Sequence, residues 1–313
     1  MRVAAIDCGT NSIRLLVADS DEDGTLVDVV RDMKIVRLGQ DVDRTGGLAP
    51  EAIERTRVAL AGYAATIREL GAEPIRMAAT SASRDASNRD DFVAMVRTTL
   101  GQDPEVITGA EEARLSFTGA AGGLSGIAPP VLVVDLGGGS TELVLGVQAN
   151  DTLGSDDLRA YSMDIGSVRM TERHLHDDPP TDAQIAAAVA DIEAAIDVAE
   201  RTVPIRDAAT FVGVAGTITT VAGLALELPE YDSSRIHGLV LSRADVDRVA
   251  EQLLHATHDE RAALPSLHPG RVDVIGAGAL VLRTLMRRIG AEELIVSEHD
   301  ILDGIALSLL WRG

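Results

Sequence analysis

Apolar and polar positions along the chain repeat one pattern twice. An apolar run at residues 3–6 ends in a polar turn of Asp, Gly and Ser and is followed by a second apolar run at 13–18. The same order returns at 131–134 and 143–147. Each apolar run is short and bounded by turn residues, which is typical of a buried strand. Each repeat is therefore predicted to be a β-hairpin with a polar tip.

The rest of the first half alternates strand and helix patterns. Strands are expected at 25–30, 75–80 and 106–107, a loop at 81–84, and helices at 50–70, 88–100 and from 109 onward. Pro50 suits the first turn of a helix and Gly71 its end. Asn88 is a candidate cap for the second of these helices. The Gly- and Pro-bearing stretch 122–130 is expected to be a linker.

Beyond the linker the pattern starts again. Strands are expected at 159–163, 211–214 and 294–296, a loop at 166–169, and helices over 181–201, from 242, over 271–288 and over 301–311. Thr181 with Gln184 forms a capping box, and Ser242 with Asp245 caps a further helix. The sequence thus predicts an α/β fold with a mixed sheet in each half.

Two domains are expected, an N-terminal one at 1–125 and a C-terminal one at 126–313. The last helix, 300–311, is a candidate to pack back on the first domain. The 313 residues suffice for two domains of ordinary size, and 46% hydrophobic with 25% charged residues is the composition of a soluble globular protein.

Composition also limits the cellular compartments and the classes of binding partner to be expected. No stretch approaches the ~18 apolar residues of a membrane span, and the N-terminus has no signal-peptide pattern, so a cytoplasmic location is expected. The single cysteine, Cys8, cannot form an intramolecular disulfide. A net charge of −21 argues against binding to nucleic acid or to an anionic membrane. It still permits a polyanionic substrate, because arginines or a metal ion can reverse the field locally.

The two polar tips, residues 7–12 and 135–140, share an Asp, a Gly two positions on and a Ser three after that, at an offset of 135 − 7 = 128 residues. Glycine and small hydroxyl residues leave backbone N–H groups accessible to an oxyanion. One copy alone is most simply an ordinary turn. The repetition favours a function, namely two tips that grip a phosphate chain.

Phosphate chemistry needs charge neutralisation and an activated water. Backbone N–H groups and hydroxyls are available for the first task at Thr10, Asn11, Ser12, Gly138, Gly139, Ser140 and Thr141. The carboxylates Asp7, Asp135 and Glu142 are candidate ligands for Mg²⁺, which prefers hard oxygen donors. A third phosphate-type turn, Gly216 with Thr217, opens a helix. Lys34, the only lysine, does not follow a glycine, which excludes a P-loop.

Four motifs in order resemble the exopolyphosphatase and guanosine pentaphosphate phosphatase family. They are Asp7-x-Gly9-x-Asn11-Ser12, Gly109-x-Glu111-Glu112-Ala113-Arg114, Asp135-x-Gly137-Gly138-Gly139-Ser140-Thr141-Glu142 and Gly213-x-Ala215-Gly216-Thr217. That family belongs to the superfamily of actin, sugar kinases and the 70-kDa heat-shock ATPases. The resemblance implies two ribonuclease-H-like domains flanking a central cleft. It also implies dependence on Mg²⁺, with Mn²⁺ as a substitute, and release of the terminal phosphate from polyphosphate or guanosine pentaphosphate. We further expect a homodimer.

The resemblance also implies roles for individual residues. Glu112 becomes the general base, Arg84 a phosphate-binding arginine of the catalytic site, and Asp135 with Glu142 the carboxylates that handle metal and phosphate. The implied phosphate-binding set is Gly9, Thr10, Asn11, Ser12, Gly137, Gly138, Gly139, Ser140, Thr141, Gly216 and Thr217. Without the flanking motifs, Glu111 and Glu112 would be an acidic first helical turn that complements the helix dipole, and Glu111 keeps that interpretation. Arg84 alone would be a surface arginine.

Two rival interpretations remain open, and a third is disfavoured by the spacing of the histidines. The same cleft can serve a sugar or nucleotide kinase, although Gly276-x-Gly278 is only a weak sign of an adenosine site. An actin-like nucleotide-binding module without catalysis is the second rival. For the third, a zinc hydrolase, His174, His176 and His299 lack the required spacing. Cys8 within the first tip is interpreted as a small buried apolar residue rather than a nucleophile.

Chain length bears on the substrate. Longer members of the family add a helical C-terminal region beyond the length of this sequence. We therefore expect a preference for short polyphosphate or guanosine pentaphosphate, with release of the substrate between cleavages.

Overall fold

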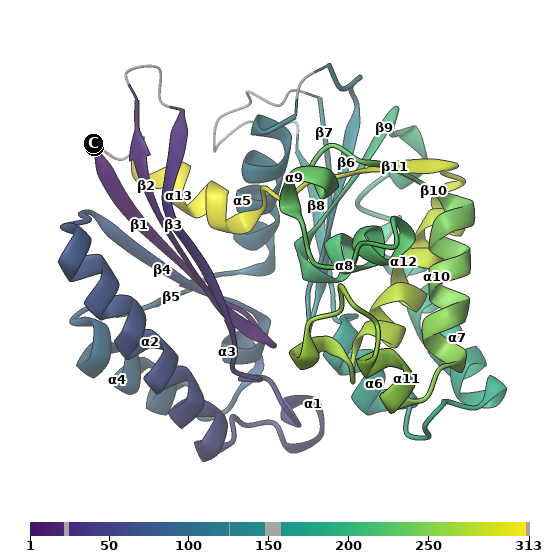
Figure 1. Cartoon of the computed structure of the whole chain (residues 1–313), viewed down its shortest axis with the longest axis horizontal. Coiled ribbons are helices and arrows are strands. Elements are labelled where there is room, and N and C mark those ends of the chain that lie inside the picture. The colour runs from purple at the N-terminus through teal and green to yellow at the C-terminus, as the bar shows by residue number, and fades with distance from the viewer. Residues whose placement is uncertain (22–24, 125, 148–157, 311–313) are drawn as a thin grey trace. The chain divides into compact units, whose positions relative to one another are not determined.

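The computed structural model describes residues 1–21, 25–124, 126–147 and 158–310 (Figure 1). Its contacts divide the chain into two compact units. The first unit comprises Met1–Gly119 with Ile301–Gly313, and the second comprises Ala120–Asp300. Trp311, the predicted end of the last helix, lies outside the described residues.

The first unit contains a five-stranded mixed sheet. Its strands are β1 (Arg2–Cys8), β2 (Ser12–Ser20), β3 (Leu26–Ile35), β4 (Ile75–Ala79) and β5 (Glu105–Val106), in the order β3-β2-β1-β4-β5. β1, β4 and β5 run parallel, whereas β2 and β3 are antiparallel neighbours. β3 is longer than the predicted 25–30. An edge strand keeps half of its side chains in water, so the mixed polar and apolar residues 31–35 did not show the apolar run by which strands were predicted.

The helices of the first unit are α1 (Val42–Thr45), α2 (Pro50–Leu70), α3 (Ser81–Asp85), α4 (Arg89–Leu100), most of α5 (Gly109–Gly122), and α13 (Ile301–Leu310). α2 and α4 cover one face of the sheet and α13 the other (Figure 1). Alternation along β1 explains this, since Ala4 and Ile6 face the first layer while Val3 and Ala5 face the second. Cys8 is 1% exposed in the first core, and burial raises the pKa of its thiol, which confirms its interpretation as a buried apolar residue.

The second unit repeats the first sheet strand for strand. Its strands are β6 (Val131–Leu136), β7 (Thr141–Gly146), β8 (Arg159–Met163), β9 (Thr210–Val214), β10 (Val240–Ser242) and β11 (Glu293–Val296), in the order β10-β11-β9-β6-β7-β8. β6, β9 and β11 are parallel, β7 and β8 antiparallel, and β10 is added at one edge. The predicted α/β class with a mixed sheet in each half is confirmed.

Helices enclose one large apolar core in the second unit. They are α6 (Ser167–His174), α7 (Asp182–Ala199), α8 (Ala215–Ala225), α9 (Ser233–Ile236), α10 (Arg243–His255), α11 (His258–Ala262) and α12 (Ile275–Ile289), with single 3-10 turns at Ile205–Asp207 and Pro269–Arg271. The capping box of Thr181 and the Ser242 cap are confirmed.

Besides the length of β3, the sequence-based assignment was wrong in four places. Residues 81–84 and 166–169, predicted as loops, form α3 and the start of α6. Both segments are short and polar, and their helical form depends on tertiary contacts rather than on local propensity. Asn88 sits at a cap position, but its amide bonds both backbone groups of Leu48, at 2.8 and 3.0 Å, instead of capping α4. α12 begins at Ile275 rather than at Arg271, because a 3-10 turn comes first.

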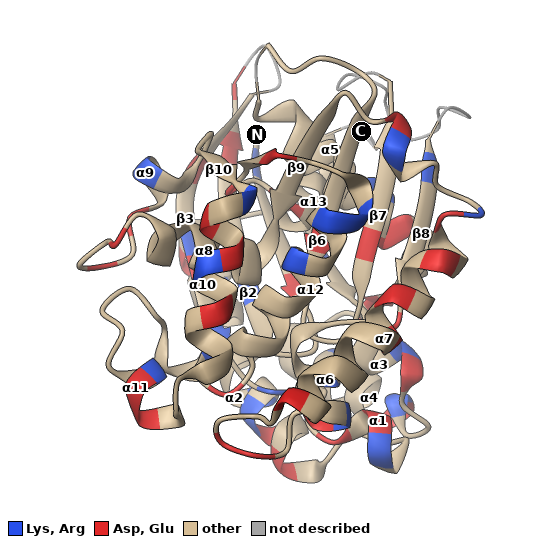
Figure 2. Cartoon of the chain, turned by 90° about the vertical axis from the view of Figure 1, so that its right-hand side faces the viewer, with Lys and Arg blue, Asp and Glu red and all other residues tan. Residues whose placement is uncertain are grey.

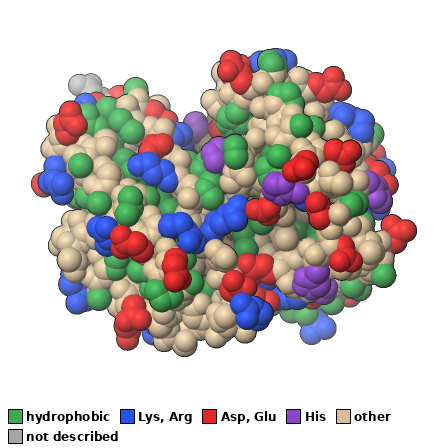
Figure 3. Space-filling view, turned by 60° about the horizontal axis from the view of Figure 1, so that its bottom comes forward, with side chains coloured by type: hydrophobic (Ala, Val, Ile, Leu, Met, Phe, Trp, Pro, Cys, Tyr) green, Lys and Arg blue, Asp and Glu red, His purple; other side chains and the backbone are tan. Residues whose placement is uncertain are grey.

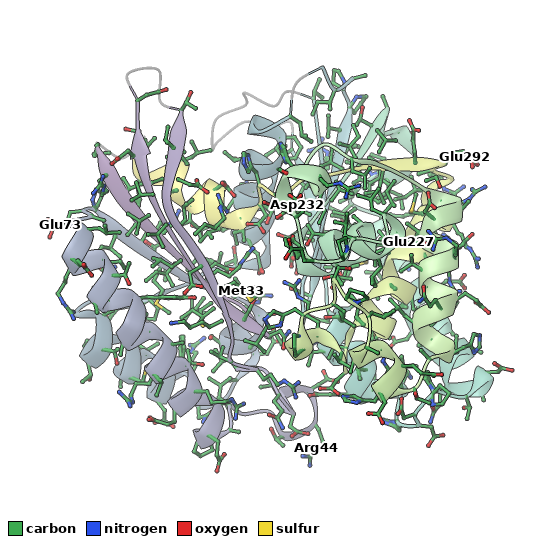
Figure 4. All side chains as sticks on the ribbon, in the orientation of Figure 1. Met33, Arg44, Glu73, Glu227, Asp232 and Glu292 are labelled. Atoms are coloured by element: carbon green, nitrogen blue, oxygen red, sulfur yellow. The ribbon has the colours of Figure 1, made fainter. Side chains whose placement is uncertain are left out.

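Both glycine turns lie at the carboxyl end of a parallel strand. Glu73 and Glu292 mark the opposite, amino ends of β4 and β11, where their side chains project outward (Figure 4). The carboxyl ends of parallel strands meet at one edge of a sheet, where ligands bind in α/β proteins. Among the described residues, no helix is long and apolar enough to cross a membrane.

Candidate functional site

The first glycine turn (residues 7–12) and the second glycine turn (residues 135–140) close with the same hydrogen bond. The N–H of Gly9 donates to the carbonyl of Ser12 at 3.0 Å, and the N–H of Gly137 donates to that of Ser140 at 3.0 Å. Each turn joins two antiparallel strands, β1 to β2 and β6 to β7. The two predicted hairpins are confirmed.

Helix α6 holds the second glycine turn from one side. The backbone N–H groups of Ser167 and Val168 donate to the carbonyls of Gly137 and Gly138 at 3.0 and 2.8 Å. Only glycine permits this approach, because a Cβ on Gly166 would lie 2.4 Å from the carbonyl oxygen of Gly138. In a trans peptide the C=O and N–H point to opposite sides. The bound carbonyls therefore direct the next two N–H groups away from α6.

Three N–H groups of this turn lack a partner within the chain. Among the described residues, none accepts a hydrogen bond from the N–H of Gly138, Gly139 or Ser140. Gly139 and Ser140 are nevertheless buried. Buried backbone N–H groups are nearly always paired in folded proteins, so a set of adjacent unpaired donors indicates a place for an anion.

The loop at residues 36–39 binds carbonyls of the first glycine turn, as α6 binds carbonyls of the second. The carbonyl of Thr10 accepts from Gly39 at 2.8 Å, and that of Asn11 accepts from Val36 and Arg37 at 3.0 and 2.9 Å. The hydroxyl oxygens of Thr10 and Ser81 lie 2.9 Å apart, which ties the turn to the start of α3. The backbone of this turn is thus held from one side, like that of the second.

The aspartates of the two turns face side chains of opposite charge. Asp7 faces Arg14 across β1 and β2, and a nitrogen of that guanidinium lies 2.7 Å from Asp7 Oδ2. Asp135 instead faces Glu142 across β6 and β7. These two carboxylates are 6% and 1% exposed, and Ser162 Oγ donates to Glu142 Oε1 at 2.7 Å.

Like charges opposite each other on a hairpin repel, the more so when they are buried. A cation between Asp135 and Glu142 would relieve that repulsion, and at the first hairpin Arg14 faces Asp7. Mg²⁺ commonly takes one or two carboxylates and completes its shell with water and phosphate oxygens. The hard oxygen donors at the second hairpin fit such an ion. Nowhere in the described part of the chain do three His, Cys, Asp or Glu side chains gather into a metal-binding group.

The two predicted catalytic residues lie together in the first unit. Arg84 on α3 donates from Nη1 to Glu112 Oε2 at 3.0 Å and to the carbonyl of Ile107 at 3.2 Å. The parallel pairing of β4 with β5 explains the proximity, since α3 and α5 begin where these strands end. Glu112 is only 7% exposed, unlike a helix-dipole acid in solvent. Its neighbour Glu111 turns instead to Arg76, at 2.6 Å.

The third turn lies beside the second glycine turn, because β9 pairs with β6 and places Val214 opposite Asp135. Ala215 has a φ of +73°, which is a strained left-handed conformation for a residue with a Cβ. The guanidinium of Arg271 packs against Gly216, where a Cβ would lie 2.2 Å from one of its nitrogens. Thr217 lies against Gly278 of α12 in the same way.

Arg14, Ser162 and Arg271 contact the predicted site residues but were missed in the sequence. Arg14 had a signal, since it follows Asp7 by the same seven positions that separate Glu142 from Asp135. Ser162 and Arg271 reach their places only through strand pairing and helix packing. Thr141, predicted to bind phosphate, donates its hydroxyl to the carbonyl of Ile165 at 2.5 Å, so this group helps to position α6.

Charges of both signs are interspersed on the sides of the molecule that Figures 2 and 3 show. Acidic and basic bands alternate along the helices in Figure 2, and the face in Figure 3 mixes red and blue side chains. Basic residues of α12 pair with acids of other helices, as Arg287 does with Asp247 at 2.9 Å and Arg283 with Glu251 at 3.2 Å. These arginines are therefore partly neutralised by their neighbours.

Two α/β units that each carry a glycine turn, the second with three N–H groups that have no acceptor among the described residues and a facing pair of carboxylates, form a structure suited to handling phosphate. The chain belongs to the Ppx/GppA phosphatase family, whose sequence profile matches residues 16–312, and the suspected family is thereby confirmed. Exopolyphosphatase 2 of Mycobacterium tuberculosis is 52% identical over 320 residues, covering 98% of each chain. A crystal structure of an exopolyphosphatase-like protein is 46% identical, covers 98% of this chain and 97% of its own, and superposes with a TM-score of 0.93. A Ppx/GppA family member of Aquifex aeolicus is 31% identical, covering 100% of this chain and 98% of its own, with a TM-score of 0.80.

Proposed function

We propose that this protein is an exopolyphosphatase, a hydrolase that releases the terminal phosphate of inorganic polyphosphate. Membership of a phosphatase family and 52% identity to a protein named exopolyphosphatase support the proposal. The observation that carries it is local. Three adjacent N–H groups without acceptors among the described residues lie in the turn that follows Asp135, and Glu142 faces Asp135 across the hairpin.

Phosphate binding is assigned to the second glycine turn. The N–H groups of Gly138, Gly139 and Ser140 donate to oxygens of the substrate, and they do so without rearrangement because α6 already fixes the turn. Asp135 and Glu142 would hold Mg²⁺, or Mn²⁺ in its place, and a divalent ion there supplies charge neutralisation for the phosphates.

Proton transfer is assigned to the first unit. Glu112 takes a proton from the attacking water as general base, and Arg84 orients Glu112 through their ion pair and binds a phosphate oxygen. A phosphate that draws Arg84 toward itself leaves the Glu112 oxygen available for the water. The structural partner of Glu111, Arg76, keeps that neighbouring carboxylate occupied.

An assay of the purified protein with Mg²⁺ tests this function. Phosphate release is measured from short polyphosphate, long polyphosphate and guanosine pentaphosphate, and phosphotransfer to sugars and nucleotides is measured in parallel. We expect release from polyphosphate, faster on short chains and with intermediates visible on long ones. Release from guanosine pentaphosphate alone, or transfer to an acceptor without release, would assign the site to another reaction.

Assembly is proposed as a homodimer, which light scattering of the purified protein tests directly. A monomer at assay concentrations would refute the proposed homodimer and would leave the proposed hydrolase activity unaffected.

A further inference from the structure

We propose that Arg169 is a positioning residue that fixes the peptide between Gly139 and Ser140 in the orientation that binds phosphate. The inference rests on the proposed function, in which the second glycine turn holds the substrate. Arg169 lies in the first turn of α6, and its Nε donates to the carbonyl of Gly139 at 2.7 Å.

The start of α6 secures three successive carbonyls by two different means. Its backbone N–H groups bind the carbonyls of Gly137 and Gly138, the latter accepting from Arg169 N as well, at 3.1 Å. The next carbonyl, that of Gly139, is bound by the Arg169 side chain instead. One residue thus contributes both its backbone and its guanidinium to the same turn.

The bond at Gly139 determines where the next N–H points. Glycine residues allow a peptide plane to turn over at little cost, so the sequence alone leaves the orientation of this peptide open. With the carbonyl of Gly139 held against α6, the N–H of Ser140 must point the other way. There it joins the N–H groups of Gly138 and Gly139, which the backbone of α6 aims in the same direction. Ser140 is 2% exposed, and no described residue accepts from its N–H.

An arginine suits this position better than a neutral donor. A charged donor forms a stronger hydrogen bond to a carbonyl, and the planar guanidinium keeps Nε in a fixed direction. Its positive charge also lies next to the turn, where it attracts an anion in a protein whose net charge is −21. The more flexible ammonium of a lysine would retain that charge but orient the carbonyl less firmly.

The same helix offers a matched control. Arg173, one turn further along α6, pairs with Asp191 at 2.7 Å, and both side chains are 31% exposed. Replacing it removes one positive charge and the pair with Asp191 from α6, and Arg173 makes none of the bonds described above between α6 and the glycine turn.

The test compares Arg169→Met with Arg173→Met. Steady-state phosphate release from short polyphosphate with Mg²⁺ gives kcat and KM, inhibition by inorganic phosphate gives Ki, and thermal unfolding gives Tm. For Arg169→Met we expect KM and Ki to rise together by about 10- to 100-fold, the worth of one hydrogen bond to a charged group. kcat should change less, Tm should match that of Arg173→Met, and Arg169→Lys should recover part of the loss.

Two results would overturn the inference. One is a KM and Ki for Arg169→Met within twofold of those for Arg173→Met, and the other is a fall in Tm with both constants unchanged. If Arg169→Met does not fold, Arg169→Lys against Arg173→Lys decides the matter by the same constants. A parent protein that neither hydrolyses polyphosphate nor responds to phosphate would remove the proposed function itself, and this inference with it.

Discussion

The two hairpins of this protein share a backbone and differ in charge. Both close with a glycine N–H bonded to a serine carbonyl at 3.0 Å, and both carry an aspartate at the end of the first strand. The residue opposite that aspartate is Arg14 in the first hairpin and Glu142 in the second. A guanidinium therefore faces the aspartate of the first hairpin, whereas a second buried carboxylate faces the aspartate of the other.

This difference separates two roles that the repeated motif alone would assign to both copies. At the first hairpin, the Arg14 guanidinium lies 2.7 Å from Asp7 Oδ2 and offsets the charge of that buried carboxylate. Two facing carboxylates gain stability from a divalent cation, which in turn attracts phosphate. We therefore propose that metal and phosphate bind at the second hairpin and that Asp7 has a structural role, whereas the sequence alone predicts Asp7, Asp135 and Glu142 together as metal ligands.

The largest effect should come from the base that the first unit supplies. Glu112→Gln keeps shape and hydrogen bonding but removes the proton acceptor, so kcat should fall by ~10²–10⁴ with KM little changed. Glu111→Gln is the matched control, an identical change one residue away at a carboxylate that pairs with Arg76. Steady-state kinetics on both variants provide the check, and equal kcat values for the pair would refute the assignment.

Converting the second hairpin into a copy of the first should be nearly as damaging. Glu142→Arg places a guanidinium opposite Asp135, as Arg14 stands opposite Asp7. We expect the pair to close on itself and Mg²⁺ activation to be lost, with a fall in kcat/KM of about 10²-fold or more. Magnesium titrations of activity measure this. A variant that retains the parent's titration curve would show that the metal lies elsewhere.

A smaller effect is expected at Arg84, which touches the base. Arg84→Lys keeps the charge but loses the fork that reaches Glu112 and a phosphate oxygen together, so kcat/KM should drop by about 10- to 100-fold. Arg97→Lys is a suitable control because Arg97 forms an exposed pair with Asp103, at 2.6 Å. Indistinguishable kinetics for the two variants would place Arg84 outside the site.

The smallest effect concerns stability at the first hairpin. Arg14→Met leaves the buried Asp7 carboxylate without its guanidinium and should lower the free energy of unfolding by about 1–3 kcal/mol. The double variant Asp7→Asn with Arg14→Met should recover most of that loss, since no buried charge remains. Denaturant unfolding measures both. If Arg14→Met unfolds like the parent, the ion pair is not what neutralises this turn.

Much of the fold could be predicted from the periodicity of apolar residues and from the proline and glycine residues that begin or end helices. Apolar runs located β1, β6 and β9, and Pro50 with Gly71 bounded α2 to the residue. What failed was decided by tertiary contact. The helical form of residues 81–85 and 167–174 depends on neighbouring turns, and the polar end of β3 is held by pairing at a sheet edge.

The candidate site divides in the same way. Glycine turns and carboxylates were readable because glycine, serine and aspartate in a fixed order imply a backbone that approaches an anion. The side chains that contact these turns could not be predicted. Arg169, Arg271 and Ser162 reach the turns only after helices and strands have packed. The exception is Arg14, whose spacing from Asp7 matched that of Glu142 from Asp135 and could have distinguished the hairpins beforehand.

Binding of Mn²⁺ followed by electron paramagnetic resonance, in the presence of inorganic phosphate, tests the division of labour most directly. The parent, Asp7→Asn and Glu142→Gln are titrated under identical conditions, with thermal unfolding to establish that each is folded. We predict that Asp7→Asn binds Mn²⁺ like the parent, whereas Glu142→Gln loses the site or weakens it by at least about tenfold. Loss of binding in Asp7→Asn with full binding in Glu142→Gln would contradict the account.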